Sequence, residues 1–203
     1  MIQLRLAKPE DLPEILSIYT PYITDTTVSF EYVVPSQEQF RARFDGISKQ
    51  FPWLVCEVDG VVAGYAYASE AFERVAYQWN ADIAVYIHEQ HHRRGIASAF
   101  YRCLEDLLRL QGYHRLYALV TGENQKSMDF HNANGYKRFA VFQDSGFKFG
   151  KWLDVIWYEK VLKPCEGTPQ PPRAFPTMAP SEVQPVLNAH SAALERMQST
   201  RER

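Results

Sequence analysis

The sequence predicts an α/β protein in which one mixed sheet is flanked by helices. Segments with the two-residue period of strands alternate with segments of helical period, but only in the second half of the chain. A doubly wound sheet would need that alternation throughout. Apolar residues make up 46% of the 203 residues, enough for a sizeable core. We therefore expect elements in the order β-α-α-β-β-β-α-β-α-β-β.

Local signals place the elements of the first half. Ile2 to Leu6 alternates apolar and polar residues as a half-buried strand does, and Pro9 suits the first turn of a following helix. Thr24 to Val34 is predicted to be loop. Ser36 opens a Ser-Gln-Glu-Gln capping box, which predicts a second helix. The dipeptide Asp59-Gly60 is typical of a tight hairpin between two strands, expected from Pro52 to Val58 and from Val61 to Ala68.

Glycines bound the helices of the second half. Gly95 opens one helix, and Gly112 ends it at the position just past a helix where glycine is preferred. Gly135 ends a second helix, expected from Glu123 to Asn134. The remaining strands are predicted from Asp82 to Ile87, Arg115 to Val120, Tyr136 to Phe142 and Trp152 to Val161.

The composition of the chain changes at Lys163. Lys163 to Pro185 contains most of the prolines and few aliphatic residues. Such a segment buries too little surface to offset the entropy of ordering it. We therefore divide the chain into a domain of residues 1–162 and a Pro-rich C-terminal tail of residues 163–203, which we expect to be poorly ordered and dispensable for activity. Within the tail, Val186 to Met197 is a candidate amphipathic helix.

Charge and composition exclude several classes of function. The formal net charge of −2 disfavours nucleic acid as the main partner, since phosphate backbones require a basic surface. No apolar run approaches the roughly 20 residues of a membrane-spanning helix. Three widely spaced cysteines suggest neither a disulfide framework nor a metal site. We expect a cytoplasmic protein that contacts neither membrane nor nucleic acid and holds no metal.

A glycine turn between a strand and a helix carries the first functional signal. Backbone N–H groups of Arg93 to Ser98 would point outward at the helix start, where the helix dipole favours an anion. Arg93 and Arg94 add positive charge, and the small Ala97 permits close approach of a ligand. This turn is typical of a phosphate or pyrophosphate site. The alternative is an ordinary turn whose arginines face water.

The same segment contains a competing motif. His88-Glu89-Gln90-His91-His92 satisfies His-Glu-x-x-His, which binds zinc when both histidines lie on one face of a helix. The residues just before it are predicted to be strand, so a loop is the better interpretation. We therefore expect these histidines to lie in a loop near the anion site.

Several motifs together resemble a known family. His92-Arg93-Arg94-Gly95-Ile96-Ala97 resembles the acetyl-CoA signature of GNAT acetyltransferases, Gln/Arg-x-x-Gly-x-Gly/Ala, and departs from it at His92. Over roughly residues 2 to 162 the chain is similar to the phosphinothricin acetyltransferase branch. Further matching motifs are Asn124-x-x-Ser127, His131-x-x-x-Gly135-Tyr136, Gly146-Phe147-Lys148 and Trp152-x-Asp154-Val155. The resemblance implies a GNAT fold with a mixed, mostly antiparallel sheet, and acetyl-CoA as the co-substrate.

The resemblance also implies roles for individual residues. The strand Val85, Tyr86 and Ile87 would pair with the pantetheine arm, and the N–H of Val85 would donate to the thioester oxygen. Asp82 would take the proton of the attacking amine, and His131 would supply one to the leaving thiolate. The cofactor residues implied are Val85, Tyr86, Ile87, Arg93, Arg94, Gly95, Ile96, Ala97, Ser98, Asn124 and Ser127. Structural alternatives are a salt-bridge role for Asp82, helix capping by Asn124 and Ser127, and an interface role for His131.

The acceptor pocket is predicted less directly. Phe30, Glu31, Arg74, Tyr77 and Trp79 lie on loops or strand ends near the expected cleft, where Arg74 could bind a carboxylate. The resemblance implies a small amine acceptor such as phosphinothricin or methionine sulfoximine, and a homodimer. No cysteine has the context of a nucleophile, which favours direct attack in a ternary complex. Two alternatives stay open: a GNAT enzyme for a different small amine, and a catalytically silent acyl-CoA-binding module.

Overall fold

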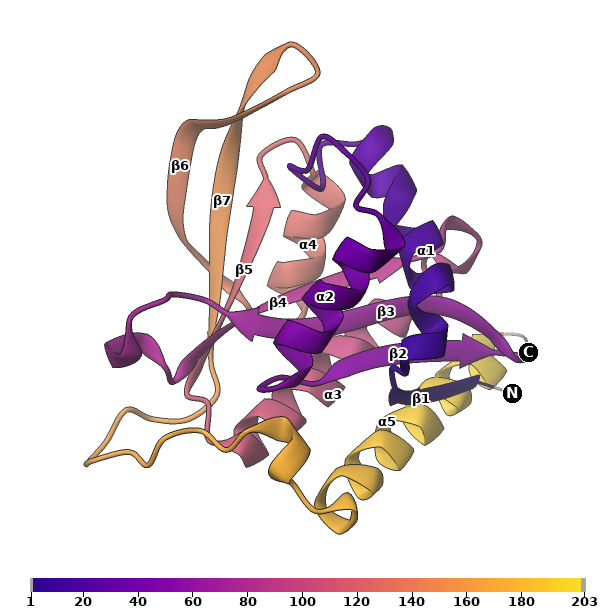
Figure 1. The fold of residues 1–203 in the computed structure, drawn as a ribbon, viewed down its shortest axis with the longest axis vertical. Helices are drawn as coiled ribbons and strands as arrows, with labels where there is room; N and C mark the ends of the chain where they lie inside the picture. Colours follow the sequence, from indigo (N-terminus) through magenta and orange to yellow (C-terminus); the bar gives the residue numbers. More distant parts are fainter. Residues whose placement is uncertain (1, 202–203) are drawn as a thin grey trace.

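The computed structural model describes residues 2–201 and contains a seven-stranded sheet with helices on both faces (Figure 1). The strand order is β1-β2-β3-β4-β5-β7-β6. Only the β4–β5 pair is parallel within the described residues, so the sheet is mixed and mostly antiparallel, as predicted. The strands are β1 (Ile2–Leu6), β2 (Trp53–Val58), β3 (Val61–Glu70), β4 (Asn80–Ile87), β5 (Arg115–Thr121), β6 (Lys137–Lys148) and β7 (Lys151–Val161).

The helices follow the predicted order, and the candidate helix of Val186 to Met197 is observed as part of a longer helix, α5. The α-helices are α1 (Leu12–Thr24), α2 (Gln37–Ser48), α3 (Ile96–Gln111), α4 (Gln125–Ala133) and α5 (Pro180–Arg201). Short 3-10 helices are η1 (Pro9–Asp11), η2 (Val75–Tyr77), η3 (Glu89–His91) and η4 (Phe175–Thr177). Within residues 2–201, no helix is both long and apolar enough to cross a membrane.

The two faces of the sheet pack into two separate apolar cores. Along β2, Leu54 and Cys56 point to the face covered by α3 and α5, whereas Trp53 and Val55 point to the face covered by α1 and α2. This alternation follows from the two-residue period of a strand. A strand that is buried on both faces reads as a continuous apolar run, as this one does.

Capping fixes the ends of the helices near the site. The capping box at α2 is confirmed: Ser36 Oγ accepts the N–H of Gln39 at 3.1 Å, and Gln39 Oε1 accepts the N–H of Ser36 at 2.9 Å. Gly112 ends α3 with a φ of 108°, a left-handed conformation that favours glycine.

β4 and β5 separate along their length, and this separation makes room for a ligand. Their pairing is limited to three positions, the last joining Asp82 to Tyr117. Beyond Asp82 the two strands diverge, while β4 stays paired to β3 as far as Ile87. In the described part of the chain, the edge of β4 that faces β5 therefore has no strand partner over residues 83–87. The N–H and C=O of Ile87 are bonded to the side chains of Tyr22 and His92, and the other backbone groups on this edge are left for a ligand.

The C-terminal tail differs from the expectation of poor order. Helix α5 packs along α3 and β1, with Leu187 and Leu194 buried in the core (Figure 1). Ser191 Oγ accepts the N–H of Leu4 at 2.8 Å and so covers part of the exposed edge of the sheet. The prolines lie mainly in the connection that precedes α5, so the composition argument failed for the helix itself. The domain boundary near residue 162 stays a prediction.

Candidate active site

A cavity of about 550 Å³ lies where β4 and β5 diverge. Its walls come from both strands, from α1, α3 and α4, from β7 and from the loop between α1 and α2. Of the residues predicted for the site, seven line this cavity: Phe30, Glu31, Asp82, Val85, Tyr86, Ser127 and His131. A cavity of this size suits a small ligand or the end of a longer one.

Asp82 lies at the last paired position of β4, at the point of divergence. Its Oδ1 is buried and has no hydrogen-bond partner among the described residues. Desolvation raises the pKa of this carboxyl from 3.8 to about 7, and a backbone hydrogen bond from Ile83 opposes the rise only in part. A carboxylate with a pKa near 7 that faces a cavity has the properties of a general base.

A tyrosine and a histidine form the wall opposite Asp82. Tyr101 Oη lies 2.9 Å from Nε2 of His131, whose Nδ1 lies 2.7 Å from the Ser127 carbonyl oxygen. Because a carbonyl oxygen only accepts, we assign the ring proton to Nδ1, which leaves Nε2 to accept the Tyr101 hydroxyl proton. Burial lowers the pKa of His131 to about 4, so the imidazole is neutral near pH 7. The ring proton is donated to the Ser127 carbonyl oxygen, so the Tyr101 hydroxyl is the member of this pair that can donate a proton to a ligand.

The N-terminus of α4 brings Ser127 and His131 onto one face of the helix. Asn124 Oδ1 accepts the N–H of Ser127 at 3.1 Å, so Asn124 is the N-cap of α4. Asn124 itself does not line the cavity. Capping, one of the alternatives considered for Asn124, is thus observed.

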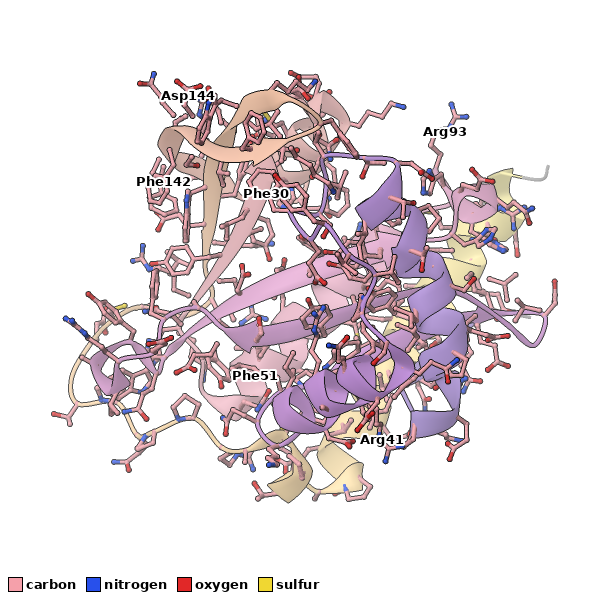
Figure 2. The ribbon with its side chains drawn as sticks, turned by 45° about the horizontal axis from the view of Figure 1, so that its top comes forward. Phe30, Arg41, Phe51, Arg93, Phe142 and Asp144 are labelled. Carbon is pink, nitrogen blue, oxygen red and sulfur yellow. The ribbon has the colours of Figure 1, made fainter. Side chains whose placement is uncertain are left out.

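The turn before α3 has the backbone shape expected of an anion site. Arg93 and Gly95 have φ values of 61° and 82°, and α3 begins at Ile96. No side chain among the described residues caps this end of α3. The first N–H groups of the helix therefore stay available to an anion. Figure 2 shows Arg93 extending outward from this turn.

His92 holds the turn against the end of β4. Its Nε2 donates to the carbonyl oxygen of Ile87 at 2.9 Å, and the Tyr22 hydroxyl donates to the same oxygen at 2.7 Å. The segment His88 to His92 includes the 3-10 helix η3 rather than an α-helix, so it lacks the geometry that a His-Glu-x-x-His zinc site requires. Among residues 2–201 there is no group of three or more His, Cys, Asp or Glu side chains placed to hold a metal ion.

The loop between α1 and α2 forms the outer wall of the cavity. Glu31 Oε1 accepts hydrogen bonds from the Tyr19 hydroxyl at 2.9 Å and from Arg43 Nη1 at 2.7 Å. Arg43 therefore neutralises the Glu31 carboxylate, and Tyr19 fixes its position. Phe30 lies beside the β6–β7 hairpin (Figure 2), where a Cβ on Gly146 would overlap its ring. Only glycine at position 146 leaves space for that ring.

Lys148 anchors this loop to the β6–β7 hairpin. Its Nζ donates to the carbonyl oxygens of Ile23 at 2.7 Å, Thr26 at 2.9 Å and Ser29 at 2.6 Å. The residue is 2% exposed, and desolvation lowers the pKa of its ammonium group. Because all three of its donors bind carbonyl oxygens, the Lys148 ammonium has a structural role and is not available to bind an acceptor carboxylate.

Three residues predicted for the acceptor pocket lie elsewhere. Arg74, Tyr77 and Trp79 lie before the paired end of β4, opposite the end at which the strands diverge, and none of them lines the cavity. Trp79 Nε1 donates to the Gln170 carbonyl oxygen at 2.9 Å, and Tyr77 packs against Phe72 with ring centroids 5.0 Å apart. The sequence does not show at which end of β4 the strands separate, so it could not place these three residues relative to the cavity.

The cavity also contains residues that sequence reasoning missed. Tyr101 lies on the apolar stripe of α3, where its spacing indicates core rather than chemistry. Thr121 ends β5, and its buried hydroxyl has no partner among the described residues. Neither residue belongs to a recognisable motif. Only the buried hydroxyl groups facing the cavity identify them.

Comparisons with known proteins agree with this geometry. Residues 4–157 match the model of the acetyltransferase (GNAT) domain. The chain belongs to the GNAT family of acetyltransferases. It is 31% identical to phosphinothricin N-acetyltransferase of Streptomyces viridochromogenes over 172 residues, which cover 85% of this chain and 92% of that protein. It is 27% identical to L-methionine sulfoximine/L-methionine sulfone acetyltransferase of Pseudomonas paraeruginosa, over 82% of this chain and 98% of that protein.

A solved GNAT structure of similar fold contains acetyl-CoA. The phosphinothricin acetyltransferase of Sinorhizobium meliloti in complex with acetyl-CoA superimposes with a TM-score of 0.78 at 28% identity, over 86% of this chain and 98% of that one. Members of the GNAT family take their acetyl group from acetyl-CoA. The diverging strands β4 and β5, the unpaired edge of β4 and the uncapped start of α3 fit this co-substrate.

The cysteines of this GNAT enzyme do not form an acyl-enzyme site. Cys56 and Cys103 are buried, and desolvation raises the pKa of each thiol to about 12. Cys165 is exposed and lies outside the cavity. A nucleophilic cysteine needs thiolate at working pH and contact with the substrate, so direct attack by the amine on the thioester is favoured.

Proposed function

We propose that this enzyme acetylates the amine of a small amino-acid-like acceptor, such as phosphinothricin or methionine sulfoximine, by direct attack in a ternary complex with acetyl-CoA. The observation that carries the proposal is Asp82, a buried carboxyl with a pKa of about 7 at the divergence of β4 and β5. The names of the relatives support this choice of acceptor.

Acetyl-CoA would occupy the space between the diverging strands. The pantetheine arm pairs with the free edge of β4 at Val85, and the Val85 N–H donates to the thioester oxygen as it gains negative charge. Of the predicted strand residues, Ile87 is not free for this pairing, because its backbone is bonded to Tyr22 and His92. The diphosphate lies on the N–H groups of residues 93–98, beside Arg93 and Arg94. Ser127 contacts the arm from α4, and Asn124 holds the start of that helix.

Asp82 removes the proton that the attacking amine must lose. The amine attacks in its neutral form, and as its nitrogen bonds to the thioester carbon the Asp82 carboxylate accepts the proton that the nitrogen loses, through a bridging water, since an aspartate side chain is short. The carbon–sulfur bond breaks, and CoA leaves as a thiolate. No acyl-enzyme forms, because the acetyl group passes straight to the amine.

The Tyr101–His131 pair would stabilise the leaving thiolate. The thiolate accepts a hydrogen bond from the Tyr101 hydroxyl, which turns away from Nε2 of His131. His131 therefore acts through Tyr101, and its low pKa keeps it neutral in both arrangements. A neutral partner is suitable because it leaves the tyrosine proton free to move between two acceptors.

The acceptor would lie against the loop between α1 and α2. Phe30 provides an apolar wall, and Glu31 is held in place by Tyr19 and Arg43. The cavity of about 550 Å³ must also contain the acetylated end of CoA, which limits the acceptor to a small molecule.

A homodimer is the assembly that the surface favours. Phe139 and Phe142 on β6 are 48% and 51% exposed, and they contact Trp157 on β7 at ring centroid distances of 6.2 Å and 5.2 Å. An exposed aromatic cluster of this kind marks a protein interface. Light scattering after size exclusion should give twice the chain mass, and the double variant Phe139→Ser, Phe142→Ser should give the mass of one chain.

We also propose that the enzyme acts in the cytoplasm, where acetyl-CoA is made and thiols stay reduced. Its cysteines are free thiols, two of them buried. Cell fractionation followed by immunoblotting tests the location, and recovery outside the cytoplasmic fraction would contradict it.

The direct test of activity is CoA release. With acetyl-CoA and phosphinothricin the enzyme should release CoA, and without an amine it should release almost none. A silent acyl-CoA-binding module would bind acetyl-CoA but release no CoA with any amine.

A matched pair of variants tests where the diphosphate binds. Ser98→Glu places a negative charge in the first turn of α3, where it favours the helix but repels an anion. Ser98→Gln has nearly the same shape without the charge. We expect calorimetry to show acetyl-CoA affinity at least about 10-fold weaker for Ser98→Glu than for Ser98→Gln. Equal affinities would contradict the assignment.

A further inference from the structure

The last two turns of α5 contact the turn that precedes α3. The matched GNAT domain ends at residue 157, so α5 lies outside it. Leu194 packs into the core between α5 and the rest of the protein, and the helix continues past it to Met197 and Gln198. Both of these residues touch the proposed diphosphate turn, and neither has a role in the function described so far.

Met197 fills the space on one side of Gly95. A Cβ at Gly95 would lie 2.8 Å from Met197 Sδ and 3.0 Å from Met197 Cε. Gly95 thus has two reasons to be glycine: its φ of 82° and the thioether packed against it. The space beside Gly95 is thus filled by a side chain from α5.

Gln198 sets the orientation of the neighbouring peptide. Its Nε2 donates to the Arg94 carbonyl oxygen at 3.2 Å. In a planar trans peptide the carbonyl oxygen and the next N–H point in opposite directions. With the Arg94 oxygen directed at α5, the Gly95 N–H is directed away from α5. A hydrogen bond to the carbonyl also polarises the peptide and strengthens its N–H as a donor.

We propose that Met197 and Gln198 are positioning residues for acetyl-CoA: they hold the 94–95 peptide so that its N–H faces the diphosphate. This inference rests on the proposed location of the diphosphate at the start of α3. It assigns to the C-terminal helix a part in co-substrate binding and replaces the expectation that the tail is dispensable.

The test compares two acetyl donors. Acetyl-CoA carries the diphosphate, whereas S-acetylpantetheine carries the same thioester and arm without it. Met197→Ala and Gln198→Ala should each weaken acetyl-CoA binding by about 3- to 10-fold, the effect of losing one net hydrogen bond or one packing contact. Their kcat/KM with S-acetylpantetheine should stay that of the unmodified enzyme. Met197→Leu, which keeps the volume, should restore the affinity.

Leu187→Ala is the control for a loss of structure alone. Leu187 is 2% exposed and lies on the same helix, almost three turns before Met197. This variant should lower the melting temperature at least as much as Met197→Ala does. It should change kcat/KM by the same factor with acetyl-CoA and with S-acetylpantetheine. The proposal would be overturned if Met197→Ala and Gln198→Ala changed kcat/KM equally with the two donors. It would also be overturned if they changed kcat/KM with neither donor.

The Ser98 pair separates this inference from the function on which it rests. If Ser98→Glu binds acetyl-CoA as well as Ser98→Gln does, the diphosphate site itself is wrong. If Ser98→Glu weakens binding while Met197→Ala and Gln198→Ala do not, the site is right and the positioning role of α5 is wrong. A chain ending at Leu194 gives a second measurement, because it removes both contacts and keeps the buried leucines. This shortened chain should lose as much affinity for acetyl-CoA as the two single variants lose together. Its kcat/KM with S-acetylpantetheine should not change.

Discussion

Replacing Asp82 by asparagine isolates the effect of one buried charge. Asparagine has the shape of a protonated aspartic acid, and the carboxyl of Asp82 is protonated in the folded protein below about pH 7. The variant therefore resembles the unmodified protein at low pH and differs from it at high pH. In the unmodified protein, stability should fall and the catalytic rate should rise as the pH increases through about 7.

The stability difference follows from the pKa of Asp82. Burial raises this pKa from 3.8 to about 7, so the folded protein binds a proton that the unfolded chain has lost. The contribution of this group to stability is complete below about pH 4 and is lost as pH rises through about 7. At 1.36 kcal/mol per unit the loss is about 4 kcal/mol, an upper limit because the residue is only half-buried and faces a cavity that water can enter.

Thermal unfolding and kinetics between pH 4 and 9 measure both effects. Asp82→Asn should match the unmodified protein in melting temperature near pH 4 and exceed it by several degrees at pH 8. Its kcat should fall about 10- to 100-fold at pH 8, with little change in KM, because a base acting through water is removed. A pH–rate profile that still rises through about 7 in Asp82→Asn would show that another group is the base. A melting temperature difference that does not change with pH would refute the burial argument.

Three further predictions concern the walls of the cavity. Lys148→Met should raise the acceptor KM about 10-fold and leave the KM for acetyl-CoA unchanged, because the loss of charged hydrogen bonds frees only the outer loop. The control is Lys151→Met, at an exposed site on the same hairpin, which should change neither KM. Tyr101→Phe should lower kcat about 10-fold without raising either KM, since the thiolate forms late in the reaction; a change confined to KM would contradict this role. NMR should show no titration of His131 between pH 5 and 8, and a midpoint near 6.5 would mean that the ring is not buried as described.

Local sequence signals predicted most elements, because those signals act over a few residues. The Ser36 capping box and the glycine at position 112 each fixed a helix end, and both are observed. Asp82 and Val85, whose roles the resemblance to GNAT acetyltransferases implied, both line the cavity. The resemblance to GNAT acetyltransferases added the acetyl-CoA site to this framework.

The failures concern contacts between distant parts of the chain. Burial of Leu187 and Leu194 depends on α3 and β1, more than 75 residues away in sequence, so composition alone could not predict that α5 is ordered. Lys148 is of a residue type that is seldom buried. Its three carbonyl partners come from the end of α1 and the loop that follows it, more than 115 residues earlier. No local pattern indicates such a contact.

The choice of acceptor is tested by kcat/KM at saturating acetyl-CoA. The panel consists of phosphinothricin, methionine sulfoximine, a polyamine and an aminoglycoside at pH 8. We predict the highest values for the two amino-acid analogues. Beside the acetylated end of CoA, the cavity of about 550 Å³ leaves less room for an aminoglycoside than for an amino acid. A second ammonium group of a polyamine would find the Glu31 carboxylate already paired with Arg43. A clear preference for the polyamine or the aminoglycoside would contradict the account.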